Sequence, residues 1–260
     1  MKKAVLQFSH GNSYPASCYR QLLTPLEKKF KINAVEMFGH NKKYPVTDGW
    51  TYLVEELIDS IETFTDEPVY GVGHSLGGIL TFIAAVKRPD LFKAVVMLDS
   101  PIYSRLKSML LKWSKQLDLI DRVTPGGGKT LTRKRHWPNA EAALHYLRSK
   151  TVFKNFTEEC LKDYIIYGME KTASGLQLKY NVNIEHKIYR TIPHDLPKLK
   201  NQLKVPLIVL YGANSDVLHS YDIKNLRRSF KNVQIHKIPG GHLFPFECPK
   251  ETAELLFRIL

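Results

Sequence analysis

The chain has 260 residues, of which 43% are hydrophobic and 24% charged, a composition that excludes disordered and collagen-like proteins. Lys and Arg outnumber Asp and Glu by 38 to 25, which gives a formal net charge of +13. No stretch approaches the roughly 18 uninterrupted apolar residues of a membrane-spanning helix, and the first apolar run is too short for a signal peptide. The three cysteines are far apart and odd in number, which disfavours a disulfide framework. We therefore expect a soluble, cytoplasmic protein.

Short apolar strands alternate with amphipathic helices along most of the chain, and Asp48 is a candidate N-cap of one of these helices. Strands that are apolar on both faces and joined by helices indicate a mostly parallel sheet covered on both sides, a doubly wound α/β fold. The expected strands are 3–8, 32–37, 69–72, 94–98, 205–211 and 233–238, and the expected helices are 14–30, 48–64, 76–86, 221–230 and 249–260.

The alternation of strands and helices lapses for about a hundred residues after the fourth strand. Residues 1–100 and 201–260 are predicted to form the α/β core, and residues 101–200 a mostly helical insert. The insert carries 19 Lys and Arg against 9 Asp and Glu, so most of the excess positive charge lies there.

The most specific motif is G-x-S-x-G at residues 73–77, which follows a predicted strand and opens a predicted helix. Its glycines, Gly73 and Gly77, leave room for a strained turn that holds Ser75 clear of the sheet. The start of the following helix offers unpaired N–H groups and a partial positive charge, which favour an oxyanion. The motif predicts Ser75 as a nucleophile, and the alternative is a glycine-rich turn with an idle serine.

A serine nucleophile needs a base within hydrogen-bond reach, oriented in turn by a third group. Two later loops supply candidates: Asp216 follows the strand at 205–211, and His242 follows the strand at 233–238. His10 and His74 flank the predicted site, and we expect structural roles for both.

The motifs SHGN, GHSLGG, GANSD and GGHLFPFECP resemble those of the α/β-hydrolase superfamily, and specifically its small capped serine esterases and lipases, over nearly the whole chain. The resemblance implies that Ser75 is the nucleophile, His242 the general base and then acid, and Asp216 the residue that orients His242. Asp99, at the end of the strand at 94–98, is an alternative acid because some lipases use that position, although we expect it to be a loop or pocket residue. It also implies an oxyanion hole formed by the backbone N–H groups of Asn12 and Leu76. The superfamily usually begins with two antiparallel strands that this chain lacks, so we predict a sheet of about six strands.

In this superfamily an insert at the same place forms a helical cap that sets substrate size and polarity. Aromatic and aliphatic residues of the insert, including Trp113, Leu117 and Tyr164, are candidates to line an acyl or aromatic pocket, and we expect about half of this set to form the core of the insert itself. The insert has a basic run made of Lys129, Arg133, Lys134 and Arg135, with Lys112 and Lys115 upstream. This run has three interpretations: a solvated face, attraction of anionic substrates, or binding of nucleic acid or membranes. No nucleic-acid-binding motif supports the last of these.

We predict a serine hydrolase that cleaves small-molecule carboxylic esters through an acyl-enzyme. We expect no cofactor and no metal, since the histidines show no compact ligand spacing. Thioesterases, lactonases and carbon–carbon bond hydrolases use the same constellation and remain alternatives. A further alternative is a non-catalytic protein of the same fold that binds a ligand. Oligomeric state and natural substrate are left open by the sequence.

Overall fold

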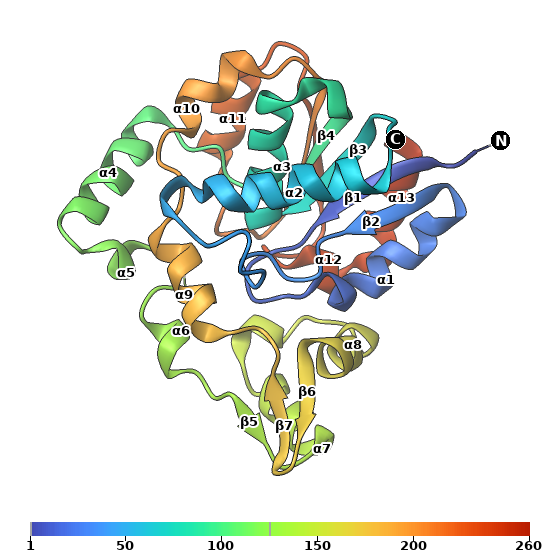
Figure 1. Cartoon of the computed structure of the whole chain (residues 1–260), viewed down its shortest axis with the longest axis vertical. Coiled ribbons are helices and arrows are strands. Elements are labelled where there is room, and N and C mark those ends of the chain that lie inside the picture. Colours follow the sequence, from blue (N-terminus) through green and yellow to red (C-terminus); the bar gives the residue numbers. More distant parts are fainter. Residues whose placement is uncertain (1, 125) are drawn as a thin grey trace.

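The computed structural model describes residues 2–124 and 126–260, and its centre is a six-stranded sheet of order β2-β1-β3-β4-β8-β9 (Figure 1). Every strand pair in this sheet is parallel. The prediction of a doubly wound, mostly parallel sheet of about six strands, interrupted after its fourth strand, is confirmed. The strands are β1 (Ala4–Ser9), β2 (Phe30–Ala34), β3 (Val69–His74), β4 (Phe92–Leu98), β8 (Leu207–Gly212) and β9 (Gln234–Ile238).

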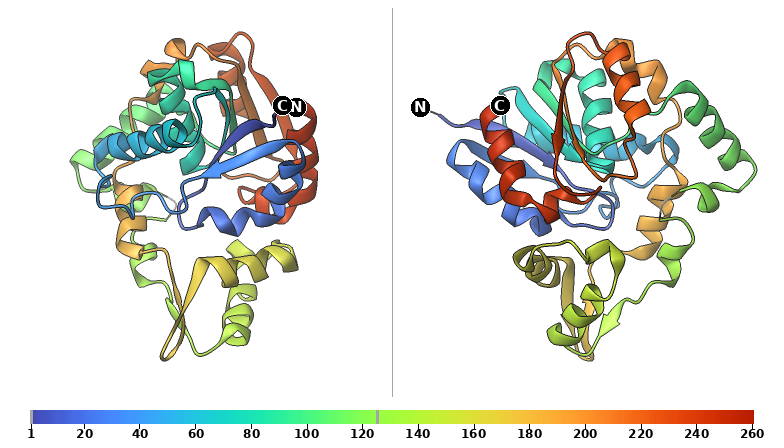
Figure 2. Two further views of the ribbon diagram at one scale, coloured as in Figure 1. Left: turned by 45° about the vertical axis from the view of Figure 1, so that its right-hand side comes forward. Right: turned by 180° about the vertical axis from the view of Figure 1, so that it is seen from behind.

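Helices cover both faces of the sheet (Figures 1 and 2). Successive side chains of a strand point to opposite faces, so Val5 joins one hydrophobic cluster while Leu6 and Phe8 join the other. The helices on the Val5 face are α2 (Thr51–Phe64), α3 (Leu76–Lys87) and α11 (Ser220–Ser229), and those on the opposite face are α1 (Arg20–Leu23), α12 (Phe244–Glu247) and α13 (Pro249–Ile259).

Two of the expected helices differ from the structure. The segment expected as one helix at 14–30 is a series of short turns, with 3-10 turns at Ala16–Tyr19 and Thr24–Lys28 on either side of α1. Helix α2 begins at Thr51 because Gly49 and Trp50 adopt left-handed backbone conformations, with φ of 74° and 59°. The expectation that Asp48 caps this helix is therefore wrong, and its carboxylate instead forms an ion pair with Lys115.

The insert between β4 and β8 holds seven α-helices among its described residues and a small antiparallel sheet of order β5-β7-β6 that the sequence did not lead us to expect. Its strands are only two to four residues long, too short for a recognisable alternation. The elements are α4 (Arg105–Gln116), α5 (Ile120–Val123), α6 (Lys129–Thr132), β5 (His136–Trp137), α7 (Ala140–Arg148), α8 (Glu158–Gly168), β6 (Met169–Thr172), β7 (Gly175–Leu178), α9 (Val182–Arg190) and α10 (Leu196–Leu199).

One lobe of the insert, formed by α7, α8 and the small sheet, packs against the loops that follow β1 and β9 (Figures 1 and 2). The Phe156 ring stacks on Phe246 with 4.7 Å between centroids, and Tyr164 lies 5.7 Å from Tyr14. The insert thus covers loops at the carboxyl ends of the parallel strands, where sites of α/β proteins lie. Among the described helices, none combines the length and the apolar character needed to cross a bilayer.

Candidate active site

The turn between β3 and α3 carries Ser75 in a strained backbone conformation, with φ of 53° and ψ of −114°. The motif glycines allow this turn because their neighbours leave no space for a side chain. A Cβ at Gly73 would lie 2.3 Å from the Gly77 carbonyl carbon, and one at Gly77 would lie 2.0 Å from the Ser9 carbonyl oxygen. The predicted elbow residues Gly73, His74 and Gly77 therefore flank Ser75, and the two glycines are required because a larger side chain would clash with the backbone.

His242, in the loop after β9, lies between a hydroxyl and a carboxylate. Its Nε2 atom is 3.1 Å from Ser75 Oγ, and its Nδ1 atom is 2.7 Å from Asp99 Oδ2. An ionised carboxylate only accepts hydrogen bonds, so Nδ1 carries the hydrogen and Nε2 is left to accept the Ser75 hydroxyl proton. The side chain of His242 keeps 25% of its exposure, so the imidazole is reachable from solvent. This is the geometry of a nucleophile, a base and an orienting acid.

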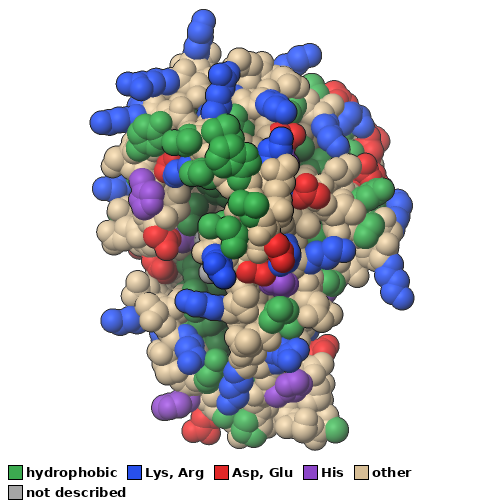
Figure 3. Space-filling view, turned by 90° about the vertical axis from the view of Figure 1, so that its left-hand side faces the viewer, with side chains coloured by type: hydrophobic (Ala, Val, Ile, Leu, Met, Phe, Trp, Pro, Cys, Tyr) green, Lys and Arg blue, Asp and Glu red, His purple; other side chains and the backbone are tan. Residues whose placement is uncertain are grey.

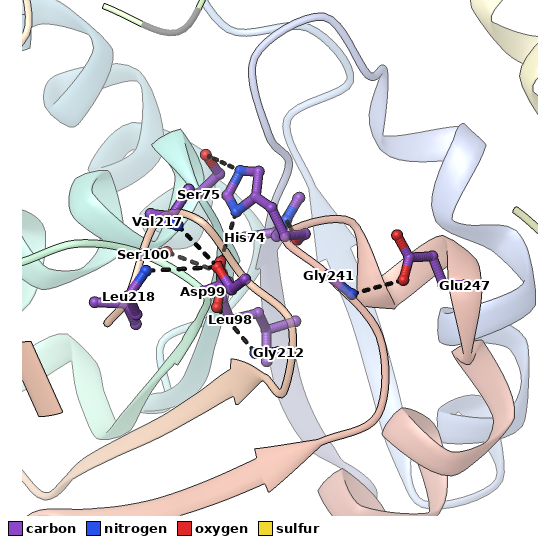
Figure 4. A network of polar contacts seen from close by, with 12 residues as sticks. His74, Ser75, Leu98, Asp99, Ser100, Gly212, Val217, Leu218, Gly241 and Glu247 are labelled. Carbon is purple, nitrogen blue, oxygen red and sulfur yellow. Dashed lines mark hydrogen bonds and ion pairs between the residues drawn. The ribbon is translucent and has the colours of Figure 1, made fainter. Parts of the chain in front are cut away.

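The carboxylate at His242 belongs to Asp99, directly after β4, and not to Asp216. Asp99 is fully buried and also accepts hydrogen bonds from the Gly212 N–H, at 3.0 Å, and from the Ser215 hydroxyl (Figure 4). Asp216 is exposed and, within the described residues, makes no hydrogen bond to His242. The expectation that Asp216 orients His242 is wrong. The loop after β8 instead supplies donors to Asp99, because β4 lies between β3 and β8 in the sheet.

His74 connects three of the loops at this edge through hydrogen bonds. Its Nε2–H donates to the His242 carbonyl at 3.0 Å, and its Nδ1 accepts from the Tyr19 hydroxyl at 2.7 Å. The Tyr19 oxygen in turn accepts from the Gly11 N–H at 3.0 Å. Burial holds the pKa of His74 well below its ordinary value, so the ring is neutral, as an acceptor at Nδ1 requires. Nothing in the sequence pointed to Tyr19.

His10 has a similar structural environment one loop away. Its Nε2 accepts a hydrogen bond from the Phe38 N–H at 2.9 Å, and its Nδ1 lies 2.8 Å from the Gly11 carbonyl. Burial lowers the pKa of His10 to about 4, which keeps the ring neutral at physiological pH. Both flanking histidines thus brace the backbone of the site loops and do not contact Ser75 Oγ in the described structure.

The two N–H groups expected to form an oxyanion hole belong to residues at the site. Leu76 is the first residue of α3, where helix N–H groups have no intrahelical acceptor. Among residues 2–124 and 126–260, neither the Asn12 N–H nor the Leu76 N–H donates a hydrogen bond. Both groups are therefore free to bind an oxyanion.

Helix α9 of the insert holds the loop that contains Asn12. The Asn12 side-chain amide donates to the Glu185 carbonyl at 3.1 Å, and the Ser13 hydroxyl donates to the Glu185 carboxylate. The same carboxylate forms an ion pair with Arg133, with 2.7 Å between Nη2 and Oε2. Glu185 is buried, and its pKa is raised by this burial and lowered by the Arg133 charge, the first effect being the larger. Sequence reasoning missed Glu185 because its partners are more than fifty residues away.

Other residues of the insert differ in their placement. Tyr164 is buried against Tyr14, near the site loops. Trp113 and Leu117 are 53% and 68% exposed, so these two candidates belong neither to an enclosed pocket nor to the core of the insert. Arg133, in the basic run, points inward to Glu185 and is not part of a solvated face.

Residues 8–255 match the model of the alpha/beta hydrolase family, which spans nearly the whole chain. The chain belongs to this family. It is 25% identical over 250 residues to the uncharacterized hydrolase YugF of Bacillus subtilis, covering 94% of this chain and 85% of that protein. It is also 25% identical over 272 residues to the monoglyceride lipase of Rattus norvegicus, covering 99% of this hydrolase and 81% of the lipase.

The fold of this hydrolase matches that of solved members of the family. The crystal structure of E-2-(acetamidomethylene)succinate hydrolase superposes with a TM-score of 0.80 at 19% sequence identity, covering 99% of this chain and 91% of that one. Within the described residues, no group of three His, Cys, Asp or Glu side chains is placed to hold a metal ion.

Proposed function

We propose that this hydrolase cleaves carboxylic esters of small to medium substrates through an acyl-enzyme, with Ser75 as nucleophile, His242 as base and Asp99 as orienting acid. The observation that carries the proposal is the continuous contact from Ser75 Oγ to His242 Nε2, at 3.1 Å, and from His242 Nδ1 to Asp99 Oδ2, at 2.7 Å. These contacts give each group the partner that its role requires.

In the first half-reaction, Ser75 Oγ attacks the carbonyl carbon of the ester while its proton passes to His242 Nε2. The Asp99 carboxylate stabilises the imidazolium that forms, and His242 then gives the proton to the departing alkoxide. In the second half-reaction, His242 takes a proton from water, the resulting hydroxide attacks the acyl-enzyme, and the proton returns to Ser75. The products are one carboxylic acid and one alcohol.

The negative charge on the carbonyl oxygen needs donors that are already in place. We assign this role to the N–H groups of Asn12 and Leu76, since neither donates elsewhere among the described residues. The N-terminus of α3, directly after Ser75, adds a partial positive charge on the same side. Glu185 holds the Asn12 loop through two hydrogen bonds, so the insert helps to position one of the two donors.

We further propose that residues 101–200 act as a cap that selects the substrate. Support comes from their contacts with the site loops, through Glu185 to Asn12 and through Phe156 to Phe246. An ester substrate is favoured because one relative is named a monoglyceride lipase and another a pimeloyl-[acyl-carrier protein] methyl ester esterase. A purely ligand-binding role is disfavoured because all three positions of the constellation hold competent side chains.

The proposal is tested by hydrolysis of p-nitrophenyl esters from acetate to laurate by the wild type and by Ser75→Ala, with fluorophosphonate labelling in parallel. We expect turnover by the wild type, labelling at Ser75, and a loss of at least about ten-thousandfold in kcat in the variant. Labelling of Ser75 without ester turnover would show that the serine is reactive but that esters are not the substrate, and thioesters or lactones would then replace them in the proposal. A protein that is neither labelled nor active would be a binding protein, and the proposal would be wrong.

A further inference from the structure

Helix α4 presents most of its large apolar side chains to solvent and its serines to the protein. Ser108 and Ser114 are buried, and the side chain of Leu111 is half-buried against the core. The outward residues recur at positions i, i+3, i+4, i+7 and i+11, which places them on one face of the helix. They are Leu106, Met109, Leu110, Trp113 and Leu117, with exposures of 63%, 47%, 54%, 53% and 68%.

The exposed apolar surface continues into the next turn of the chain. Leu119 and Val123, at and near α5, are 37% and 59% exposed. Seven of the thirteen large hydrophobic residues exposed in the described structure thus lie within residues 106–123, and we call this surface the α4–α5 face. Figure 3, which looks onto this side of the molecule, shows hydrophobic side chains gathered together with Lys and Arg side chains around them. A cluster of exposed hydrophobic side chains of this size indicates a surface that binds a partner.

The charges beside the α4–α5 face are predominantly positive. Helix α4 contains four Lys or Arg residues and no Asp or Glu. Two of them, Lys107 and Lys115, are ion-paired with Asp222 and Asp48. Arg105 and Lys112 make no ion pair among the described residues, so their charges are available to a partner.

A basic hollow of about 430 Å³ lies at the amino-terminal end of α4. Its lining includes Arg105, Lys200 and Arg228 and contains no carboxylate. Burial, and then the nearby Arg105 charge, lower the pKa of Lys200, while the Asp222 carboxylate raises it. The apolar face therefore ends at a site that suits an anionic group.

We infer that the α4–α5 face docks this protein onto an anionic lipid surface, with α4 lying in the plane of the headgroups. Exposed leucines and a tryptophan on one side, with lysine and arginine beside them, are the features of an interfacial amphipathic helix. Anionic headgroups complement the basic hollow and the unpaired cations of α4. A second copy of this chain fits less well, because each carries a net charge of +13 and the two basic surfaces would repel. The inference is independent of the proposed reaction.

The experiment is flotation of the full chain with vesicles of phosphatidylcholine alone, or of phosphatidylcholine in which about a third of the lipid is phosphatidylglycerol. We expect binding to the anionic vesicles that weakens as salt is raised, and little binding to the neutral ones. The double variant Leu110→Glu/Trp113→Glu should lower the partition coefficient at least about tenfold. The control Ile166→Glu, at a position 59% exposed on α8, should bind as the wild type does.

The contribution of charge is tested with Arg105→Gln/Lys112→Gln, which should reduce the preference for anionic vesicles. Lys28→Gln/Lys250→Gln removes the same charge from exposed positions at the 3-10 turn before β2 and in α13, and should retain most of the preference. Unchanged thermal unfolding by circular dichroism shows that each variant is folded. Failure of the wild type to bind anionic vesicles at low salt would overturn the inference. So would a dimer, seen by sedimentation velocity, that Leu110→Glu/Trp113→Glu dissociates.

Discussion

The carboxyl edge of the sheet and the outer side of the insert use polar and apolar side chains in opposite ways. At the sheet edge, Asp99 and His74 are buried, and each has hydrogen-bond partners that fix its position. On α4, buried serines face the protein while Leu110 and Trp113 face solvent. In the first region, hydrogen bonds hold the buried polar side chains in fixed positions. In the second region, the exposed apolar side chains are placed to contact a partner outside the molecule. Substitutions should therefore have large effects on catalysis and stability at the sheet edge and small ones on the outer side of α4.

The largest effect is expected from Asp99→Asn, compared with Asp216→Asn. Asp99 is the carboxylate at His242 Nδ1, whereas Asp216 is exposed. Asparagine at 99 can donate to the ring and so favour the wrong tautomer, and we expect kcat for p-nitrophenyl butyrate to fall about ten-thousandfold. Asp216→Asn should stay within about twofold of the wild type. The reverse outcome would return the acid role to Asp216.

Breaking the buried pair of Arg133 and Glu185 should have the next largest effect. Glu185→Gln leaves a largely buried guanidinium without its anion, and we expect the free energy of unfolding in urea to fall by about 3 kcal/mol. The value of kcat should also fall, because the Ser13 hydroxyl then donates to a neutral amide oxygen instead of a charged carboxylate, which is a weaker acceptor. The double variant Arg133→Met/Glu185→Leu should regain stability without regaining kcat. A Glu185→Gln protein as stable and active as the wild type would contradict this role of α9.

His10 makes stability depend on pH in a defined direction. Its pKa in the folded protein is about 4, below the ordinary value of 6.5, so between these values the unfolded chain binds the proton and the folded chain does not. Stability is therefore full above pH 6.5 and falls as pH decreases, with a loss of about 3 kcal/mol from this group by pH 4. His10→Gln should remove this part of the pH dependence of the free energy of unfolding, measured by urea denaturation at several pH values. His136→Gln, at an exposed histidine, is the control and should leave the slope unchanged.

A smaller effect is expected from Tyr19→Phe. The phenol oxygen accepts from the Gly11 N–H and donates to His74, so its removal leaves two buried polar groups without a partner. We expect the free energy of unfolding to fall by about 2 kcal/mol, measured by urea denaturation. Tyr221→Phe, at a tyrosine that is 65% exposed, should have no measurable effect. Equal stabilities for the two variants would show that the Tyr19 bridge is not stabilising.

The core of the fold could be predicted from the sequence because its signals are local. Apolar strands such as β1 and β3 are recognisable from a few residues, and the elbow at Ser75 requires glycines at fixed distances from the serine. The loop of His242 follows directly from the end of β9. The short strands of the insert gave no comparable signal, and the left-handed conformation of Trp50 moved the start of α2 to Thr51.

The sequence by itself determined the strands of the main sheet, where that sheet is interrupted, and which serine and histidine meet at its edge, since each depends on short-range patterns. Only the tertiary structure decided between Asp99 and Asp216. Both residues follow parallel strands. Which carboxylate reaches His242 depends on the strand order β3-β4-β8 and on the number of residues between each aspartate and the end of its strand. The outward orientation of α4 was likewise decided by packing. An amphipathic helix has the same sequence pattern whether its apolar face is buried or exposed, and only the neighbouring elements fix which face turns to solvent.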